Sequence, residues 1–307
     1  MGVDWLRGCA TALVTPFGAD GAVDEPRMRA LVERQIADGV RVLVPCGTTG
    51  ESATLSTDEQ RRVIALTAAV AHGRPGVSVL AGAGGNATAA VVERVQAARA
   101  AGADGVLVVA PYYNKPTQAG LIAHFRAVAA GVPGLPVVLY NVPGRTGSNI
   151  DAATVLALAR DVENVVAVKE ASGNLSQIMA ILRERPAGFG VLSGDDALTL
   201  PLMALGAEGI VSVASNEVPG PMSRLADLAL GGAWAEARAL HNRLLPLMEA
   251  NFLESNPGPV KAAMALMGLL EERFRLPLVP VQEKTRARLR ELLQELGLSC
   301  RAAHVAA

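Results

Sequence analysis

The chain has 307 residues, half of them hydrophobic and only 3% aromatic, and its 28 lysines and arginines nearly balance 29 acidic residues for a formal net charge of −1. Because no block of like charges occurs, nucleic acid and anionic membranes are poor partners for this surface. A core so short of aromatic residues must be built from Ala, Val, Leu and Ile, which favours layered parallel strands over an aromatic-rich β-sandwich.

The cysteines and histidines give no sign of a disulfide framework or a metal site. Cys9, Cys46 and Cys300 make an odd number without CxxC spacing, so we expect free thiols in a reducing compartment. The four histidines are scattered without ligand spacing, which argues against zinc and predicts no metal. The N-terminus has no apolar h-region, and no apolar run approaches the ~18 residues of a membrane span. We therefore expect a cytoplasmic protein without a membrane partner.

Eight short, β-branched runs recur along the chain, each followed by turn residues and a helix-like segment. The runs cover residues 9–14, 40–45, 77–81, 105–110, 136–140, 165–169, 190–193 and 209–213. Most are continuously apolar, as expected for parallel strands that are covered on both faces. Such alternation leaves a closed barrel or an open doubly wound sheet. Eight units without a topological break favour the barrel, so the predicted fold is an α/β, (β/α)8 TIM barrel.

Helix-like segments fill the gaps between these runs and carry capping signals. The segments include 58–71, 88–101, 120–130, 152–160 and 175–183. Ser56 and Glu59 have capping-box spacing, and Asp151 and Asn174 are the expected caps of two further helices. The chain after Pro219 has only helical patterns, including 233–250, 259–270 and 283–296. We therefore predict a barrel over 1–222 and a C-terminal helical appendage over 223–307, packed on the barrel as one structural unit.

Polar residues gather after the predicted strands, where βα barrels place their active sites. Lys169 closes an apolar strand, so its amine should point into or across the barrel mouth. Burial disfavours the charged form of a lysine, and the neutral amine is the form that attacks a ketone carbon to give an imine. Position alone leaves open a lysine that reaches solvent or pairs with Glu170. The tyrosines and hydroxyls of the neighbouring loops favour a Schiff-base nucleophile.

Four residues in the same loops could complete such a site. Tyr140 ends the adjacent strand and could carry protons, unless it only caps the core. Thr48 and Thr49 stand in a glycine-flanked turn before a helix, where N–H groups and hydroxyls can bind a carboxylate. A turn selected only for its conformation is the alternative. Arg145 could bind a second carboxylate, although a lone loop arginine is more often a surface residue.

The segment 82–87, GAGGNA, matches a dinucleotide-binding fingerprint between a strand and a helix. The next strand ends in Val109, Ala110 and Pro111, without the acidic residue that would confirm the motif. The motif also lies in the third βα unit, not the first. We therefore expect no cofactor.

Five ordered motifs resemble the dihydrodipicolinate synthase family, which belongs with N-acetylneuraminate lyase among the class I pyruvate aldolases. They are GTTGES (47–52), PYYNKP (111–116), YNVPGRTG (140–147), VVAVKEASGN (165–174) and LSGDD (192–196). The resemblance covers essentially the whole chain. It implies a lyase of lysine and diaminopimelate biosynthesis that condenses pyruvate with L-aspartate-4-semialdehyde.

The resemblance also implies catalytic roles. Lys169 would form the Schiff base with pyruvate, so that the covalent imine with substrate replaces any cofactor. Tyr140 would donate and accept protons, linked through Thr48 to Tyr113. In the family this last tyrosine reaches in from a neighbouring subunit, which implies a homo-oligomer, a tetramer built as a dimer of dimers.

Substrate-binding roles follow from the same matches. Thr49 and the backbone of Val211 would bind pyruvate, and Gly194 would keep the floor of the pocket open. Arg145 would bind the carboxylate of the semialdehyde. Arg145 and the Thr48–Thr49 pair favour the synthases, since sialic acid lyases usually carry Ser-Thr in that turn and lack the arginine. A sugar-acid aldolase and a catalytically silent, ligand-binding barrel stay open as alternatives.

Regulation by lysine is expected to be weak. Inhibited members bind lysine near positions that match four residues here, Ser52, Ala53, Asn86 and Tyr112. Strongly inhibited bacterial members carry histidines at the positions of Thr57 and Gln60 and a glutamate at Ala90. Loss of a carboxylate that would pair with the ammonium of lysine removes a contact of ~1.5–3 kcal/mol. We therefore expect a degraded allosteric site and weak or absent feedback.

Overall fold

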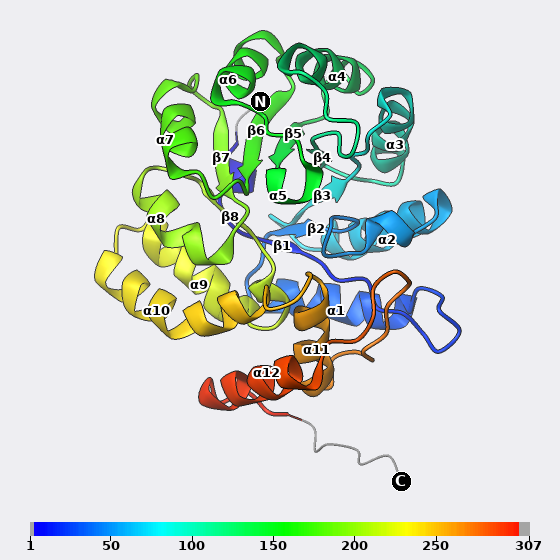
Figure 1. Cartoon of the computed structure of the whole chain (residues 1–307), viewed down its shortest axis with the longest axis vertical. Coiled ribbons are helices and arrows are strands. Elements are labelled where there is room, and N and C mark those ends of the chain that lie inside the picture. Colours follow the sequence, from blue (N-terminus) through cyan, green and yellow to red (C-terminus); the bar gives the residue numbers. More distant parts are fainter. Residues whose placement is uncertain (1–2, 301–307) are drawn as a thin grey trace.

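The computed structural model describes residues 3–300. Its centre is a closed barrel of eight parallel strands that follow one another in chain order (Figure 1). The strands are β1 (Gly8–Ala12), β2 (Val42–Val44), β3 (Ser78–Gly82), β4 (Gly105–Val109), β5 (Val137–Asn141), β6 (Val165–Glu170), β7 (Gly190–Ser193) and β8 (Gly209–Ser212). Each overlaps one of the eight apolar runs, and most strand positions are buried, so the predicted barrel is confirmed.

A layer of helices surrounds the strands (Figure 1). Its members are α1 (Glu25–Ala37), α2 (Thr57–Ala71), α3 (Thr88–Ala100), α4 (Gln118–Ala130), α6 (Ala152–Asp161), α7 (Leu175–Glu184), α8 (Thr199–Ala204) and α9 (Pro219–Leu230). The capping box of Ser56 and Glu59 has both of its hydrogen bonds, and the Asn174 side chain caps α7. Asp151 stands at the N-cap of α6 without a capping bond, because its carboxylate accepts from the Asn149 side chain instead.

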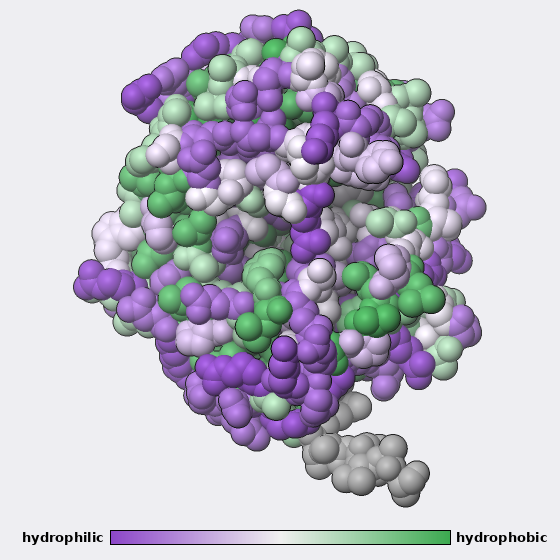
Figure 2. Space-filling view, viewed as in Figure 1, coloured by the Kyte–Doolittle hydropathy of each residue, from purple (hydrophilic) through white to green (hydrophobic). Residues whose placement is uncertain are grey.

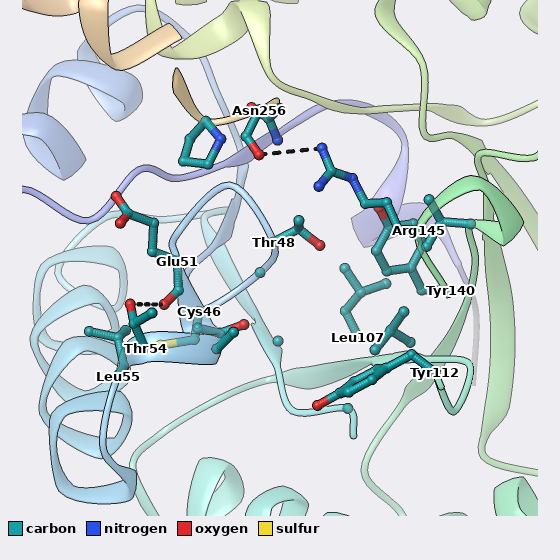
Figure 3. Close-up of a pocket in the computed structure, with 18 of the residues that line it drawn as sticks. Cys46, Thr48, Glu51, Thr54, Leu55, Leu107, Tyr112, Tyr140, Arg145 and Asn256 are labelled. Atoms are coloured by element: carbon teal, nitrogen blue, oxygen red, sulfur yellow. Dashed lines mark hydrogen bonds between the residues drawn. The ribbon is translucent and has the colours of Figure 1, made fainter. Parts of the chain in front are cut away.

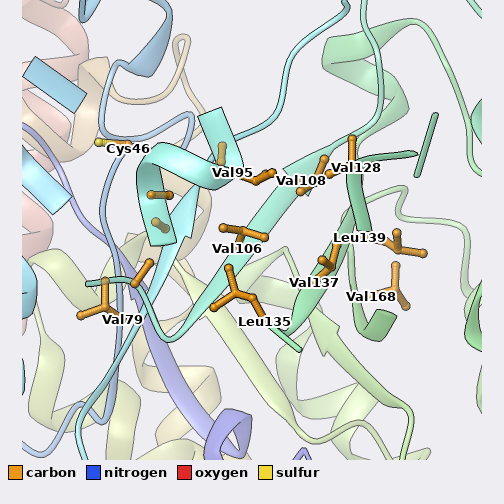
Figure 4. Packing of buried hydrophobic residues seen from close by; sticks show 14 of the residues in the cluster. Cys46, Val79, Val95, Val106, Val108, Val128, Leu135, Val137, Leu139 and Val168 are labelled. Carbon is orange, nitrogen blue, oxygen red and sulfur yellow. The ribbon is translucent and has the colours of Figure 1, made fainter. Parts of the chain in front are cut away.

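Alternation along the strands separates two cores. On β4, Val106 and Val108 face the helices, while Leu107 faces the barrel interior. Figure 4 shows Val106 and Val108 packed among apolar side chains of the surrounding elements. Toward the barrel mouth, the interior core ends in larger and more polar side chains. Tyr140 is one of them, because the same alternation on β5 turns it inward. The strand pattern therefore determines which side chains reach the barrel mouth.

The C-terminal appendage consists of α10 (Trp234–Ala250), α11 (Gly258–Leu266) and α12 (Glu283–Glu295). Its core is shared with α9 and includes Leu225 and Leu247. The boundary expected between 222 and 223 falls inside α9, which packs on β1 and β8 and so continues the helix layer of the barrel to Leu230. Residues 301–307 of the predicted C-terminal unit lie outside the described range.

Candidate active site

Lys169 and Tyr140 lie side by side at the floor of the barrel mouth. The two residues are paired in register on the neighbouring strands β5 and β6. Both are buried, and the Lys169 Nζ lies 4.2 Å from the centroid of the Tyr140 ring. Within residues 3–300, the amine has this ring contact and no hydrogen bond or ion pair. The amine is thus buried, and no polar partner among the described residues occupies it.

Glu170 does not neutralise this lysine, although it is the next residue. Its carboxylate accepts hydrogen bonds from the Asn141 side chain at 3.1 and 3.2 Å and from the Gln177 side chain at 3.1 Å. The backbone N–H of Ser172 donates a further bond at 2.9 Å. Successive residues of a strand point to opposite faces, so Glu170 is turned away from Lys169. The alternative of a Lys169–Glu170 ion pair is excluded by this geometry.

A cavity of about 130 Å³ opens above Lys169. Its walls come from seven of the eight strands or the loops after them and from the C-terminal appendage; they include Ala12, Val44, Thr48, Thr49, Leu107, Tyr140, Lys169, Gly194, Val213 and Asn256. A Cβ added at Gly194 would lie 2.6 Å from the Ala171 Cβ and 3.0 Å from the Lys169 Cε. Glycine is therefore the residue that leaves both this space and the lysine side chain free.

The turn after β2 brings Thr48 and Thr49 to the wall of the cavity. The backbone N–H of Gly50 donates to the Gly47 carbonyl at 3.1 Å, and that of Glu51 donates to the Thr48 carbonyl at 3.1 Å. Thr49 is buried, and its hydroxyl accepts a hydrogen bond from the Asn256 side chain at 3.1 Å. With its Oγ lone pair so used, the Thr49 hydroxyl proton is left to donate to an anion.

Arg145 lies on the short helix α5 (Pro143–Thr146) and donates to the Asn256 carbonyl at 3.3 Å. It lines the small cavity and a larger one of about 450 Å³ that opens outward from it. Figure 3 shows Arg145, Tyr140 and Thr48 around this outer cavity, with the guanidinium directed toward Asn256. Thr48, Tyr140 and Arg145 line both spaces, so the two cavities are neighbours that share these residues.

Tyr113 does not reach this site within one chain. Its side chain is 90% exposed and lines neither cavity, and its backbone is left-handed with φ of 75°. Among the described residues, no hydrogen bond joins Tyr140, Thr48 and Tyr113. The expected chain of three hydroxyls is therefore incomplete in a single subunit.

Two positions in the site differ from expectation. Val211 is buried in the barrel interior and lines neither cavity, whereas Val213 lines the small one. Sequence reasoning missed Asn256, which bridges Thr49 and Arg145 from the C-terminal appendage. The search for polar residues covered only the strand ends, so a loop between α10 and α11 was passed over. The Asn256–Pro257 dipeptide marks the loop as a fixed turn, but nothing local points it at the barrel.

The four residues of the expected lysine site lie together at the outer cavity. Ser52, Ala53 and Tyr112 line it, and the Asn86 side chain donates to the Tyr112 carbonyl at 3.2 Å. The Gln60 amide, by contrast, donates to the carbonyls of Ser52 at 3.0 Å and Leu55 at 3.2 Å. Its N–H groups are thus already used by the protein.

Other reactive groups near the site are not suited to catalysis. Burial raises the pKa of the Cys46 thiol to about 12, so this cysteine at the outer cavity stays protonated. The glycines of the 82–87 segment are explained by packing, since a Cβ at Gly84 would lie 2.5 Å from the Val109 backbone nitrogen. In the described part of the chain, no cluster of three His, Cys, Asp or Glu residues is placed to hold a metal, and no helix is long and apolar enough to span a membrane.

Comparison with known proteins places this geometry in one family. Residues 5–296 match the model of the dihydrodipicolinate synthetase family. The chain belongs to this family. It is 56% identical over 294 residues to the 4-hydroxy-tetrahydrodipicolinate synthase of Koribacter versatilis, with 95% of this chain and 97% of that protein covered.

Solved structures agree. The dihydrodipicolinate synthase of Aquifex aeolicus superposes with a TM-score of 0.93 at 43% identity, covering 96% of this chain and all of that one. The Acinetobacter baumannii enzyme complexed with pyruvate gives 0.92 at 41% identity, covering 95% and 99%. The predicted 4-hydroxy-tetrahydrodipicolinate synthase function, and with it a lyase of lysine and diaminopimelate biosynthesis, is confirmed. The sugar-acid aldolase and silent-barrel alternatives are not favoured.

Proposed function

We propose that Lys169 is the nucleophile of this synthase and forms an imine with pyruvate. The observation that carries the proposal is the buried Lys169 amine, which lies over the Tyr140 ring without a hydrogen bond or ion pair among the described residues. A neutral amine attacks a ketone carbon to give an imine, and no carboxylate among the described residues engages the Lys169 amine. The cavity above the amine has a volume of about 130 Å³, which suits a three-carbon acid.

The reaction balances with the groups present. The Lys169 nitrogen adds to the pyruvate ketone carbon, and the resulting carbinolamine loses water to give the imine. Loss of a proton from the methyl carbon gives the enamine, which attacks the aldehyde carbon of L-aspartate-4-semialdehyde. The substrate amine then displaces Lys169 by transimination, which closes the ring and frees the enzyme. Tyr140 is the phenol positioned to exchange protons in these steps.

Two anion sites would orient the substrates. Thr48 and Thr49 would bind the pyruvate carboxylate, with the Thr49 hydroxyl oriented by Asn256. Arg145, which lines both cavities, would bind the carboxylate of the semialdehyde and leave its aldehyde over the enamine. The covalent imine makes a separate cofactor unnecessary. Gly194 would keep the floor open, and Val211 would contribute below it as packing for the pyruvate-binding residues.

A homo-oligomer would complete the site. Tyr113, exposed on a left-handed backbone, is presented outward where a second copy could receive it. Figure 2 shows apolar patches between the hydrophilic residues of one face, as expected for a surface that packs against copies. We propose a homotetramer, assembled as a dimer of dimers, that works in the cytoplasm.

Regulation by lysine would be weak. Lysine would bind weakly at most to the site formed by Ser52, Ala53, Asn86 and Tyr112, and half-inhibition below millimolar lysine would contradict this.

Trapping the imine tests the proposal directly. The protein is incubated with pyruvate, reduced with borohydride and digested, and the Lys169 peptide is examined by mass spectrometry. A pyruvate adduct on Lys169 is expected, together with faster turnover of aspartate semialdehyde than of sialic or sugar acids. An adduct that still forms in Lys169→Ala, or none in the wild type, would overturn the mechanism.

A further inference from the structure

A second buried lysine, Lys261, lies beneath the turn that carries the two threonines. Lys261 is on α11 of the appendage, and both its side chain and that of Glu51 have no exposed surface. Their Nζ and Oε1 atoms are 2.6 Å apart. The ammonium also donates to the carbonyls of Thr15 at 3.0 Å and Arg273 at 2.5 Å. All three of its N–H groups can therefore be used at once.

The anion of this pair ends the substrate-binding turn. The backbone of Glu51 is in the left-handed region, with φ of 54°. A residue other than glycine adopts this conformation only when its surroundings fix it. Its backbone N–H donates to the Thr48 carbonyl at 3.1 Å, and its own carbonyl accepts from the Thr54 N–H and hydroxyl. Figure 3 shows Glu51 next to this turn, on the opposite side from the Thr48 side chain.

Beyond these local backbone bonds, the Glu51 carboxylate ties the turn to distant parts of the chain. The Lys261 Nζ binds one oxygen, and the Arg275 N–H lies 3.4 Å from the other. Lys261 is itself anchored between the rings of Phe17 and Phe274, at 4.5 and 4.7 Å from their centroids. The position of the turn is thus determined by the appendage, 210 residues away along the chain.

We infer that the Glu51–Lys261 ion pair is a positioning pair that fixes the Thr48–Thr49 turn for the carboxylate of pyruvate. The inference rests on the proposed function, because it concerns the same carboxylate site. Neither residue touches the substrate. Glu51 acts through the backbone of the turn, and Lys261 acts through Glu51. Asn256, two residues before α11, gives the same segment a second hold on Thr49.

The test measures pyruvate binding apart from turnover. The concentration of pyruvate that gives half-maximal borohydride trapping on Lys169 is determined for Lys261→Met, Glu51→Gln and the double variant. The double variant removes both charges together, so it leaves no unpaired buried charge and is the one expected to fold best. Arg185→Met is the matched control, because Arg185 and Glu208 form a partly buried ion pair at 2.7 Å outside both cavities.

We expect half-saturation to rise about tenfold in the double variant, the factor for a loss of about 1.4 kcal/mol in binding. Turnover at saturating pyruvate should change far less, since Lys169 and Tyr140 are untouched. The Arg185→Met control should keep the wild-type half-saturation. A folded double variant with wild-type half-saturation would overturn the inference while leaving the proposed function intact. Absence of any adduct in the wild type would instead overturn the proposed function, and the inference with it.

Discussion

The barrel floor and the C-terminal appendage each contain a buried lysine, Lys169 and Lys261, and the two lysines have opposite surroundings. Lys169 has an aromatic ring at 4.2 Å and no polar partner among residues 3–300. Lys261 has a carboxylate and two carbonyls within 3.0 Å. Desolvation lowers the pKa of Lys261, and the charge of Glu51 acts against this effect. Burial is common to both residues, so the polar partners are what distinguish them.

This difference indicates how one chain uses the same residue type in two ways. An ammonium with three oxygen acceptors is held in one place, which suits a structural role. An amine that faces a ring and a cavity is free to approach a ketone carbon. We therefore expect Lys169, the buried lysine without a polar partner among the described residues, to be the reactive one of the two.

The most severe loss of activity is expected when Lys169 is replaced. Lys169→Met should lower kcat/KM by about a thousandfold or more, because no other group in the cavity can form the imine. Steady-state assays with pyruvate and aspartate semialdehyde measure this. The thiol of Cys46, protonated at neutral pH, cannot substitute. A loss of less than tenfold would mean that the amine is not the nucleophile.

Tyr140→Phe should have the next largest effect. Removing the phenol keeps the ring over the Lys169 amine and takes away only the hydroxyl. Because general acid–base catalysis contributes about 10²- to 10⁴-fold, kcat should fall within that range. The Lys169 adduct should still form, only more slowly, which stopped-time borohydride trapping can follow. An unchanged trapping rate and kcat would remove Tyr140 from proton transfer.

The third prediction concerns stability. Lys261→Met should lower the free energy of unfolding more than Lys169→Met does. Lys261→Met leaves the Glu51 carboxylate buried and unpaired, which costs about 3–5 kcal/mol of unfolding free energy. Lys169→Met removes an amine that has no polar partner within residues 3–300, so its stability should lie within about 1 kcal/mol of the wild type or above it. Urea unfolding of both variants measures the difference. Equal destabilisation would contradict the comparison.

The sequence was sufficient to predict the fold and one half of the site. The eight apolar runs, most of them continuously apolar, predict the strands, and the residues that end them include Lys169 and Tyr140. These two are neighbours because consecutive parallel strands end at the same rim. Local pattern and topology together therefore predict which strand-end groups meet.

The C-terminal contribution could not be predicted in the same way. Lys261 lies in an apolar helix and Asn256 in a loop, and neither has a nearby partner in the sequence. Their partners, Glu51 and Thr49, are more than 200 positions away, at 210 and 207 residues. Such contacts depend on how the appendage packs on the barrel, which hydrophobic patterns do not determine. The same reason explains why Tyr113, whose partner would be another subunit, is exposed in one chain.

Filling the floor beneath the reactive lysine should have a moderate effect. In Gly194→Ala the new methyl group would meet the Lys169 Cε at 3.0 Å and the Ala171 Cβ at 2.6 Å. Overpacking of this kind costs about 1–3 kcal/mol, and here it falls on the cavity that receives pyruvate. KM for pyruvate should rise about tenfold, the equivalent of about 1.4 kcal/mol. The Gly220→Ala variant is a useful control, because the nearest atoms lie 3.9 Å from its added Cβ and Gly220 lines neither cavity.

The smallest expected effect concerns the pH dependence of stability and Arg275, which lies between α11 and α12 of the C-terminal appendage. Arg275 binds the Glu59 carboxylate at 2.5 and 2.8 Å, and this hydrogen bonding, with help from Ser56, lowers the pKa of Glu59 from 4.5 to about 2. A lowered carboxylate pKa contributes stability that is complete above the ordinary value and is lost as pH falls toward the folded one. Wild-type stability should therefore decline between pH 4.5 and 2 more steeply than that of Glu59→Gln. Thermal unfolding across this range should show the two curves converging in acid, and parallel curves would assign the acid sensitivity to other carboxylates.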